Sequence, residues 1–197
     1  MPLQNEDADG EQLPLRSDRT RALPKETISD EAQQCRSLVQ AARNGDRGAF
    51  DELYKRFYQM VHGILLSRIP ISEIDDLAQE VFLQAWGKLD SLRDDMAFGG
   101  WLAQITRRRA ADHFRHDHGT EQLPEDLRIG AVDEESWFLL NAIRRLPEAY
   151  RETLILRFVE DLTGPEIAVL TGLTPDSVRV NLHRGVKILR EQLKEKQ

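Results

Sequence analysis

The residues best suited to recognition chemistry lie near the C-terminus, within residues 163–193. Thr163 is followed three residues later by Glu166, which is the spacing of a capping box at the start of a helix. Gly172 stands where that helix should end, and Thr174 offers a hydroxyl cap for a second helix. The segment therefore predicts two helices joined by a tight turn.

The second of these helices divides into an apolar face and a polar, partly basic face. At about 100° per residue, the apolar stripe consists of Val178, Leu182, Gly185, Leu189 and Leu193. A helix-turn-helix needs this division, because one face packs on the partner helix and the other enters a DNA groove. An ordinary helical hairpin is the alternative interpretation. The opposite face holds Asp176, Ser177, Val180, His183, Arg184 and Lys187, with Arg179 on its flank.

A second candidate nucleic-acid site combines basic and aromatic residues around a helix expected over residues 101–115. Single-stranded DNA requires cations for its backbone and flat rings or a small pocket for an unstacked base. Arg107 is expected to project away from the bundle, which makes it the better phosphate ligand, whereas Arg108 can pair with Asp112 four residues on. A merely solvated charged face is the alternative. The candidate residues are Arg93, Phe98, Arg107 and Arg108.

The helix expected over residues 72–89 has an unusual outer face. Its inward arc is apolar over about 140° and accounts for burial in a bundle. A leucine among acids and amides outside that arc indicates a docking surface for a helix of another protein. A solvated face with one stray leucine is the alternative. The face consists of Asp76, Gln79, Glu80 and Leu83.

The overall charge of −7, taken alone, argues against binding to nucleic acid. Residues 1–34 carry a net charge of −4 and residues 119–143 carry −5, so the expected folded parts are neutral to slightly basic. Cys35 is the only cysteine, which agrees with a reducing cytoplasm. The N-terminal residues lack the apolar core of a signal peptide, and no apolar run reaches the roughly 18 residues of a membrane span.

Helical periodicity without sustained strand alternation predicts an all-α chain of two small domains. We expect helices starting at a Ser29 cap and ending at Asn44-Gly45, and over residues 47–68, 72–89, 101–115 and 135–145. Another begins at Pro147, before the helix-turn-helix. The predicted organisation is an acidic disordered tail (1–27), a first helical domain (28–115), a flexible acidic linker (116–133) and a helix-turn-helix domain (134–197).

Catalytic and metal-binding arrangements have little support. His113, His116 and His118 form a short cluster with neighbouring aspartates, but only the first two are at helical spacing and no matching ligand group occurs elsewhere. No nucleophile elbow, phosphate-binding loop, zinc-protease motif or dinucleotide fingerprint is present. We therefore expect no enzyme activity, no cofactor and no metal, and rank a metal-dependent enzyme last.

Three segments in order resemble the bacterial extracytoplasmic-function (ECF) sigma factors. They are DDLAQEVFLQAW at residues 75–86, WLAQITRRRAADHFR at 101–115, and the run from LPEAYRETL to HRGVKIL at 146–189, with a gap at the expected place. The resemblance implies a factor that binds core RNA polymerase and directs it to promoters. It further implies that the first domain recognises and helps melt the −10 element, while the helix-turn-helix reads the −35 element.

Carried over by position, the resemblance assigns roles to the candidate residues. The outer face of Asp76, Gln79, Glu80 and Leu83 would dock the polymerase clamp. The loop from Arg93 to Phe98 would capture a base flipped from the −10 strand. The −35 duplex would meet Arg179, Val180, His183 and Arg184, with Lys187, Ser177 and the cap at Thr163 positioning phosphates.

Two departures from the family pattern affect these assignments. Arg108 replaces a usual asparagine, which puts base choice at the −10 element in doubt. Val180, Asn181 and His183 are less polar or less basic than the residues common there. Arg184 is therefore the strongest base-reading candidate, and a bidentate contact to guanine is worth about 1–3 kcal/mol of discrimination.

The expected partners are core RNA polymerase and promoter DNA, as a duplex at −35 and melted at −10. Family members are commonly restrained by anti-sigma proteins, so one is a further candidate partner. The rival hypothesis is a self-sufficient helix-turn-helix repressor or activator, which predicts a homodimer and a palindromic site. Because neither domain is strongly basic, we expect the isolated protein to bind promoters poorly.

Overall fold

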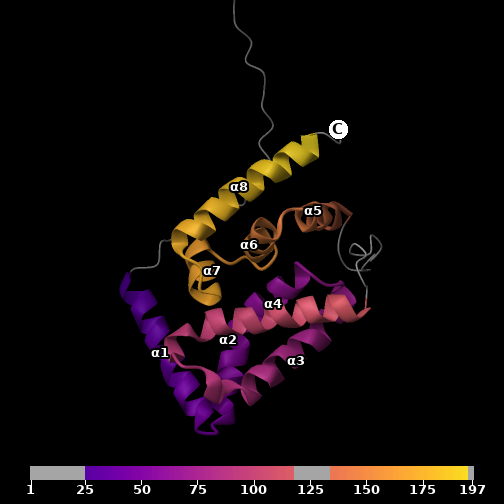
Figure 1. Cartoon of the computed structure of the whole chain (residues 1–197). Helices are drawn as coiled ribbons and strands as arrows, with labels where there is room; N and C mark the ends of the chain where they lie inside the picture. Colours follow the sequence, from indigo (N-terminus) through magenta and orange to yellow (C-terminus); the bar gives the residue numbers. More distant parts are fainter. Residues whose placement is uncertain (1–24, 118–133, 195–197) are drawn as a thin grey trace, which may run out of the picture.

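The computed structural model describes residues 25–117 and 134–194, and every regular element in these ranges is a helix (Figure 1). An all-α fold is therefore confirmed. Three short 3-10 turns lie between the helices of the first half, namely η1 (Ile71–Glu73), η2 (Leu89–Ser91) and η3 (Asp95–Ala97). The α-helices are α1 (Lys25–Arg43), α2 (Arg47–Leu66), α3 (Ile74–Gly87), α4 (Phe98–Asp117), α5 (Glu134–Arg144), α6 (Glu148–Phe158), α7 (Gly164–Thr171) and α8 (Pro175–Lys194).

The first four helices form a bundle, here the N-terminal bundle, with α2 at its centre. Helix α2 packs against α1, α3 and α4, and α3 also packs against α4. Leu53, Met60 and Ile64 of α2 are completely buried. The apolar residues of α2 recur at helical spacing over about five turns. This long apolar surface lets one helix pack against three others.

Several expected helix boundaries need correction. Ser29 does not cap α1, because the helix already begins at Lys25. Helix α3 begins after Glu73, and Ser72 lies in the short turn η1 before it. Helix α4 begins at Phe98, three residues before the expected start. The predicted tail lies mostly outside the described residues, as does nearly all of the predicted linker.

The helix-turn-helix forms as the local signals predict. The Thr163 hydroxyl accepts a hydrogen bond from the Glu166 amide, and the Glu166 carboxylate accepts one from the Thr163 amide at 2.7 Å. Gly172 has φ +73°, the left-handed conformation that ends α7. In the next turn the Thr174 hydroxyl accepts from the Ser177 amide at 3.1 Å. Both helix starts and the turn are thus set by residues within a few positions of each other.

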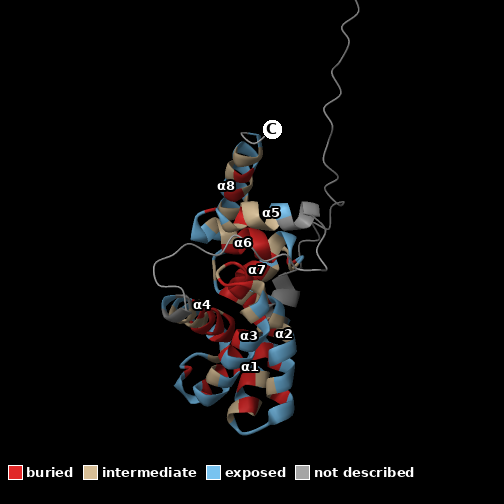
Figure 2. Cartoon of the chain, turned by 90° about the vertical axis from the view of Figure 1, so that its right-hand side faces the viewer, coloured by how far each residue is buried: buried red, intermediate tan, exposed pale blue. Residues whose placement is uncertain are grey.

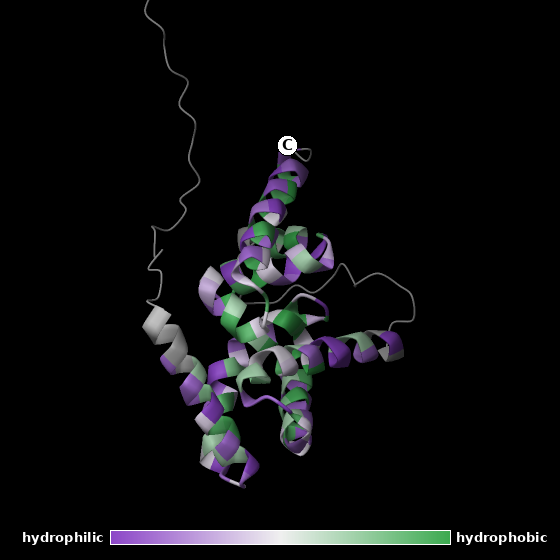
Figure 3. Cartoon of the chain, turned by 60° about the vertical axis from the view of Figure 1, so that its left-hand side comes forward, coloured by the Kyte–Doolittle hydropathy of each residue, from purple (hydrophilic) through white to green (hydrophobic). Residues whose placement is uncertain are grey.

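The C-terminal bundle, α5 to α8, is built around the packing of α8 on α6. Val178, Gly185 and Leu189 of the predicted stripe are buried. In Figure 3, α8, the helix ending at the C label, mixes hydrophobic and hydrophilic residues along its length. The buried ones pack inward against α6 and α7, whereas Val180 stands exposed among the hydrophilic residues of the outer face.

The two bundles pack directly on each other. One continuous cluster of buried side chains runs from Val39 of α1 through α2 and α4 to Ile143, Leu154 and Leu189 of the C-terminal bundle. Helix α2 contacts both α6 and α7, and α4 contacts α7. Figure 2 shows buried residues in the middle of both bundles, including the region where they meet. The sequence predicted two tethered bundles, and it did not predict this shared core.

Gly185 permits the close approach of α8 to α6. A Cβ atom at this position would lie 2.2 Å from Leu154 Cδ1 and 3.1 Å from Tyr150 Cβ. Leu154 is completely buried and has little room to move. A glycine is therefore needed here because it has no side chain, and its backbone conformation is one that other residues could adopt.

We expect Gly185→Ala to lower the free energy of unfolding by about 1–2 kcal/mol, because overpacking outweighs the gain in helix propensity. Urea unfolding followed by circular dichroism measures this change. Gly87→Ala is the matched control, since a Cβ at Gly87 meets nothing within 4 Å. Equal stability of the two variants would contradict the packing role of Gly185.

Candidate nucleic-acid and polymerase interface

The outward face of α8 presents most of the residues expected to contact the −35 duplex. Arg184 and His183 are exposed next to one another, and Val180 is 38% exposed. Arg179 is exposed as well and forms a 3.2 Å ion pair with Asp176 at the helix start. Val178 lies buried beneath this face and anchors it. The exposed members are Ser177, Arg179, Val180, His183, Arg184 and Lys187.

Thr163 differs from the other residues of that set. It is only partly exposed, at the start of α7, and both its hydroxyl and its amide hydrogen-bond Glu166. The groups through which Thr163 was expected to hold a phosphate are therefore engaged in the capping box.

The predicted docking face of α3 is exposed as a unit. Asp76, Gln79 and Glu80 are exposed, and Leu83 is 65% exposed, although it is a large aliphatic side chain. Glu80 forms an ion pair with Arg109 of α4 across this edge of the bundle. The inward residues of α3, by contrast, are buried against α2 and α4.

Phe98 does not lie where the sequence placed it. Its ring is completely buried and stacks edge-on against Phe57, with 5.0 Å between ring centroids. This burial leaves Phe98 inaccessible to a flipped base in this structure. In the same loop, residues 93–98, Arg93 is exposed and Met96 is 48% exposed. Sequence reasoning passed over Met96.

The loop of residues 93–98 is held by the end of α1. Arg43 donates hydrogen bonds to the Leu92 carbonyl at 3.0 Å and to Asp95 Oδ1 at 2.8 Å, and Gln40 donates to Asp95 Oδ2 at 3.0 Å. Partial burial works to raise the pKa of Asp95, but hydrogen bonds from Arg43 and Gln40 outweigh it and hold that pKa below its usual value. Asp95 therefore stays charged and keeps the loop fixed.

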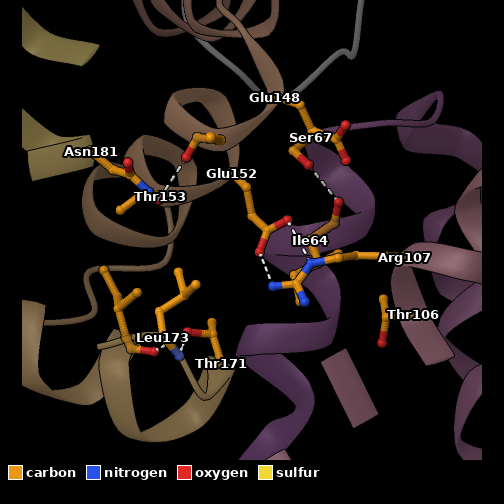
Figure 4. Close-up of polar contacts among 12 residues, drawn as sticks. Ile64, Ser67, Thr106, Arg107, Glu148, Glu152, Thr153, Thr171, Leu173 and Asn181 are labelled. Atoms are coloured by element: carbon orange, nitrogen blue, oxygen red, sulfur yellow. Dashed lines mark hydrogen bonds and ion pairs between the residues drawn. The ribbon is translucent and has the colours of Figure 1, made fainter. Parts of the chain in front are cut away.

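Arg107 points into the interface between the bundles, which contradicts the expectation that it projects away. Its Nη2 lies 2.6 Å from Glu152 Oε1 and its Nε lies 3.1 Å from Oε2 (Figure 4). Arg68 Nη2 lies 2.6 Å from the same Oε2 and 2.6 Å from Glu148 Oε1. Glu152, on α6, is only 5% exposed. We call Glu152 with Arg68 and Arg107 the Glu152 clasp.

The neighbouring basic residues of α4 have separate surroundings. Arg108 is exposed, and the expected pair with Asp112 is not formed, because Asp112 pairs with Arg115 instead. Within the described residues no group of three histidine, cysteine or acidic side chains is close enough to hold a metal ion. His113 contacts Glu73, and His118 lies outside the described residues.

Comparison with known proteins assigns both bundles. The sigma-70 region 2 family matches residues 53–119, and the sigma-70 region 4 family matches residues 139–189. The ECF RNA polymerase sigma factor RpoE of Cereibacter sphaeroides is 30% identical over 171 residues, covering 80% of this chain and 93% of the relative. This chain belongs to the ECF sigma factors. The assignment decides against the self-sufficient repressor or activator.

Other relatives of this sigma factor agree. SigW of Bacillus subtilis is 27% identical over 183 residues, covering 80% of this chain and 95% of the relative. The structure of CnrH, solved in complex with the cytosolic domain of CnrY, aligns with a TM-score of 0.61 at 25% identity, covering 83% of this chain and 99% of CnrH.

As an ECF sigma factor, the protein binds core RNA polymerase and directs transcription initiation at promoters, without enzyme activity of its own. Region 2 recognises the −10 element, and region 4 recognises the −35 element. Across residues 25–117 and 134–194, none of the helices is both long and apolar enough to cross a bilayer.

Sequence reasoning missed Glu152, the central residue of the clasp. A signal was present, since Glu152 stands three and four residues before Ile155 and Leu156 and so shares their buried side of α6. A carboxylate on an apolar face needs cationic partners. The sequence does not say which arginines supply them.

An ion pair outside the clasp gives this sigma factor a pH-dependent contact between its bundles. His62 Nδ1 of α2 lies 2.6 Å from Glu160 Oε1, just beyond α6. The hydrogen bond with Glu160 is the main cause that raises the pKa of His62, against the opposing effect of burial. The stability from this pair is complete below the usual histidine pKa and is lost as the pH rises through the raised value.

We therefore expect His62→Gln to lower the free energy of unfolding by about 1–2 kcal/mol near pH 5.5, and by much less near pH 9. Denaturant unfolding of both proteins across this pH range measures the difference. If the difference in free energy of unfolding between wild type and variant does not change with pH, the stabilising role of protonated His62 is wrong. The same conclusion follows if the difference grows at high pH.

Proposed function

We propose that Arg184 reads a base of the −35 element, with Arg179, Val180 and His183 meeting the same groove and Ser177 and Lys187 contacting phosphates. The observation that carries this proposal is the exposed face of α8 above the buried Val178 and Leu189. Helix-turn-helix proteins read bases with such a face. Thr163 acts through the capping box that sets the start of α7, and its side chain is not a direct phosphate ligand.

On the region 2 side, Arg93 and Arg108 are the proposed −10 contacts that are already exposed. Arg107 is a proposed contact only when the Glu152 clasp is open. Phe98 supports the end of the loop of residues 93–98 from within the core, through its packing on Phe57. Asp76, Gln79, Glu80 and Leu83 form the proposed polymerase-docking face.

An anti-sigma protein is a further proposed partner. The family resemblance supplies this proposal, since such proteins commonly restrain ECF sigma factors. RpoE of Bartonella quintana was solved in complex with the anti-sigma factor NepR. Its structure aligns with this chain with a TM-score of 0.50 at 20% identity, and the alignment covers 75% of this chain and 97% of RpoE. At that identity the likeness supports the shared fold alone.

Run-off transcription with core polymerase on genomic DNA tests the function and maps the promoters. On a mapped promoter, we expect Arg184→Ala to lower initiation about tenfold or more and to relax base preference at one −35 position, because a bidentate contact is lost. Arg47→Ala is the matched control, since Arg47 is an exposed arginine at the start of α2, outside the helix-turn-helix. Equal activity of the two variants would refute the role of Arg184.

For the docking face, we expect Leu83→Ala to weaken binding to core polymerase by about tenfold, because a large exposed anchor is removed. Leu83 is 65% exposed, so the melting temperature should not change. Competition for core polymerase against a labelled wild-type chain measures the affinity. Lys88→Ala, an exposed change off this face, is the control. Unchanged affinity of Leu83→Ala would remove Leu83 from the interface.

A further inference from the structure

The backbone of α7, in the C-terminal bundle, lies directly against the start of α4. Gly99 is buried, and a Cβ at this position would lie 2.5 Å from the carbonyl oxygen of Leu170 in α7. Gly100 faces the turn of the helix-turn-helix, and a Cβ on Gly172 would lie 3.1 Å from Gly100 Cα. Main chain meets main chain here, so no nucleotide fits between α7 and the first turn of α4.

The Glu152 clasp holds a residue that the −10 strand would need. Glu152 brings two carboxylate oxygens to the guanidinium groups of Arg107 and Arg68, both from region 2. A DNA phosphate offers arginine the same chemistry, namely two anionic oxygens in one plane with the guanidinium fork. Burial alone works to raise the pKa of Glu152, but Arg107 and Arg68 hold it below its usual value, so the carboxylate stays charged.

The −35 reading face, in contrast, is open in the same structure. Arg184, His183 and Lys187 are exposed on α8, on the side of region 4 that does not contact region 2. The closed arrangement therefore blocks one half of promoter recognition and leaves the other half accessible.

We propose that Glu152 is an internal substitute for a backbone phosphate of the −10 strand, and that it holds this sigma factor in a closed state unable to bind that strand. The inference rests on the proposed −10 role of region 2 and adds its regulation. Single-stranded DNA competes with Glu152 for Arg107. Binding requires α6 and α7 to leave α2 and α4.

Gly63 provides a selective way to open the molecule. It lies in α2, and a Cβ there would be 2.7 Å from Leu156 Cδ2 and 2.9 Å from Glu160 Cγ. The nearest atoms thus all belong to the C-terminal bundle. Gly63→Ala should favour α2 by itself, because alanine is the better helix former, and should clash only when the bundles close.

The test uses the full chain without polymerase. The probe is a fluorescent single strand carrying the −10 element of a promoter mapped by run-off transcription. We expect Gly63→Ala to bind it about tenfold more tightly than wild type, because affinity scales with the open fraction. X-ray scattering should show a larger radius of gyration for this variant. Gly87→Ala, a helix-favouring change with nothing within 4 Å, should resemble wild type in both measurements.

Glu152→Gln is the second variant, because it removes the substitute charge without changing the shape of the side chain. It should also bind the strand more tightly, and adding Arg107→Ala to either variant should abolish the gain. The proposal is overturned if the variants expand without binding more tightly. It is equally overturned if neither affinity nor size changes while run-off transcription proceeds normally. Absence of run-off transcription from every promoter would instead refute the proposed function.

Discussion

A carboxylate buried between two helical bundles constrains this whole structure. Removing one partner of a buried ion pair typically costs about 3–5 kcal/mol, because the remaining charge is left without water or counterion. Glu152 therefore requires Arg68, just beyond the end of α2, and Arg107 from the middle of α4 at the same time. Three helices that are far apart in the sequence must meet at one point. That point then fixes how region 4 sits on region 2.

Other arginines surround the same junction and bind main chain. Arg144 donates to the carbonyl groups of Leu66 and Ile69, where α2 ends and its last carbonyls need donors. Burial and the nearby charge of Arg151 lower the pKa of Arg144 to about 10. The bundles are thus joined by polar contacts around an apolar centre. Polar contacts of this kind can be exchanged for water or for phosphates, which an apolar interface alone would not permit.

Prediction from sequence worked where the signal was local. The capping box at Thr163, the turn at Gly172 and the stripe ending at Leu189 depend on residues within a few positions of one another. It failed for Phe98 and Arg107, because their surroundings depend on partners that are 41 and 45 positions away, Phe57 and Glu152. An aromatic beside two glycines resembles an exposed loop tip, and an arginine in a basic run resembles a solvated face. Only the packed helices distinguish these cases.

Arg43 has a consequence for how this sigma factor can diversify. The region 2 match begins at residue 53, so α1 lies before it, yet Arg43 and Gln40 of α1 hold the loop of residues 93–98 in place. Loss of Arg43 or Gln40 would therefore free the Asp95 carboxylate without any change in the loop itself. Two sigma factors with the same loop sequence would then hold that loop differently, because the helix that supports it differs.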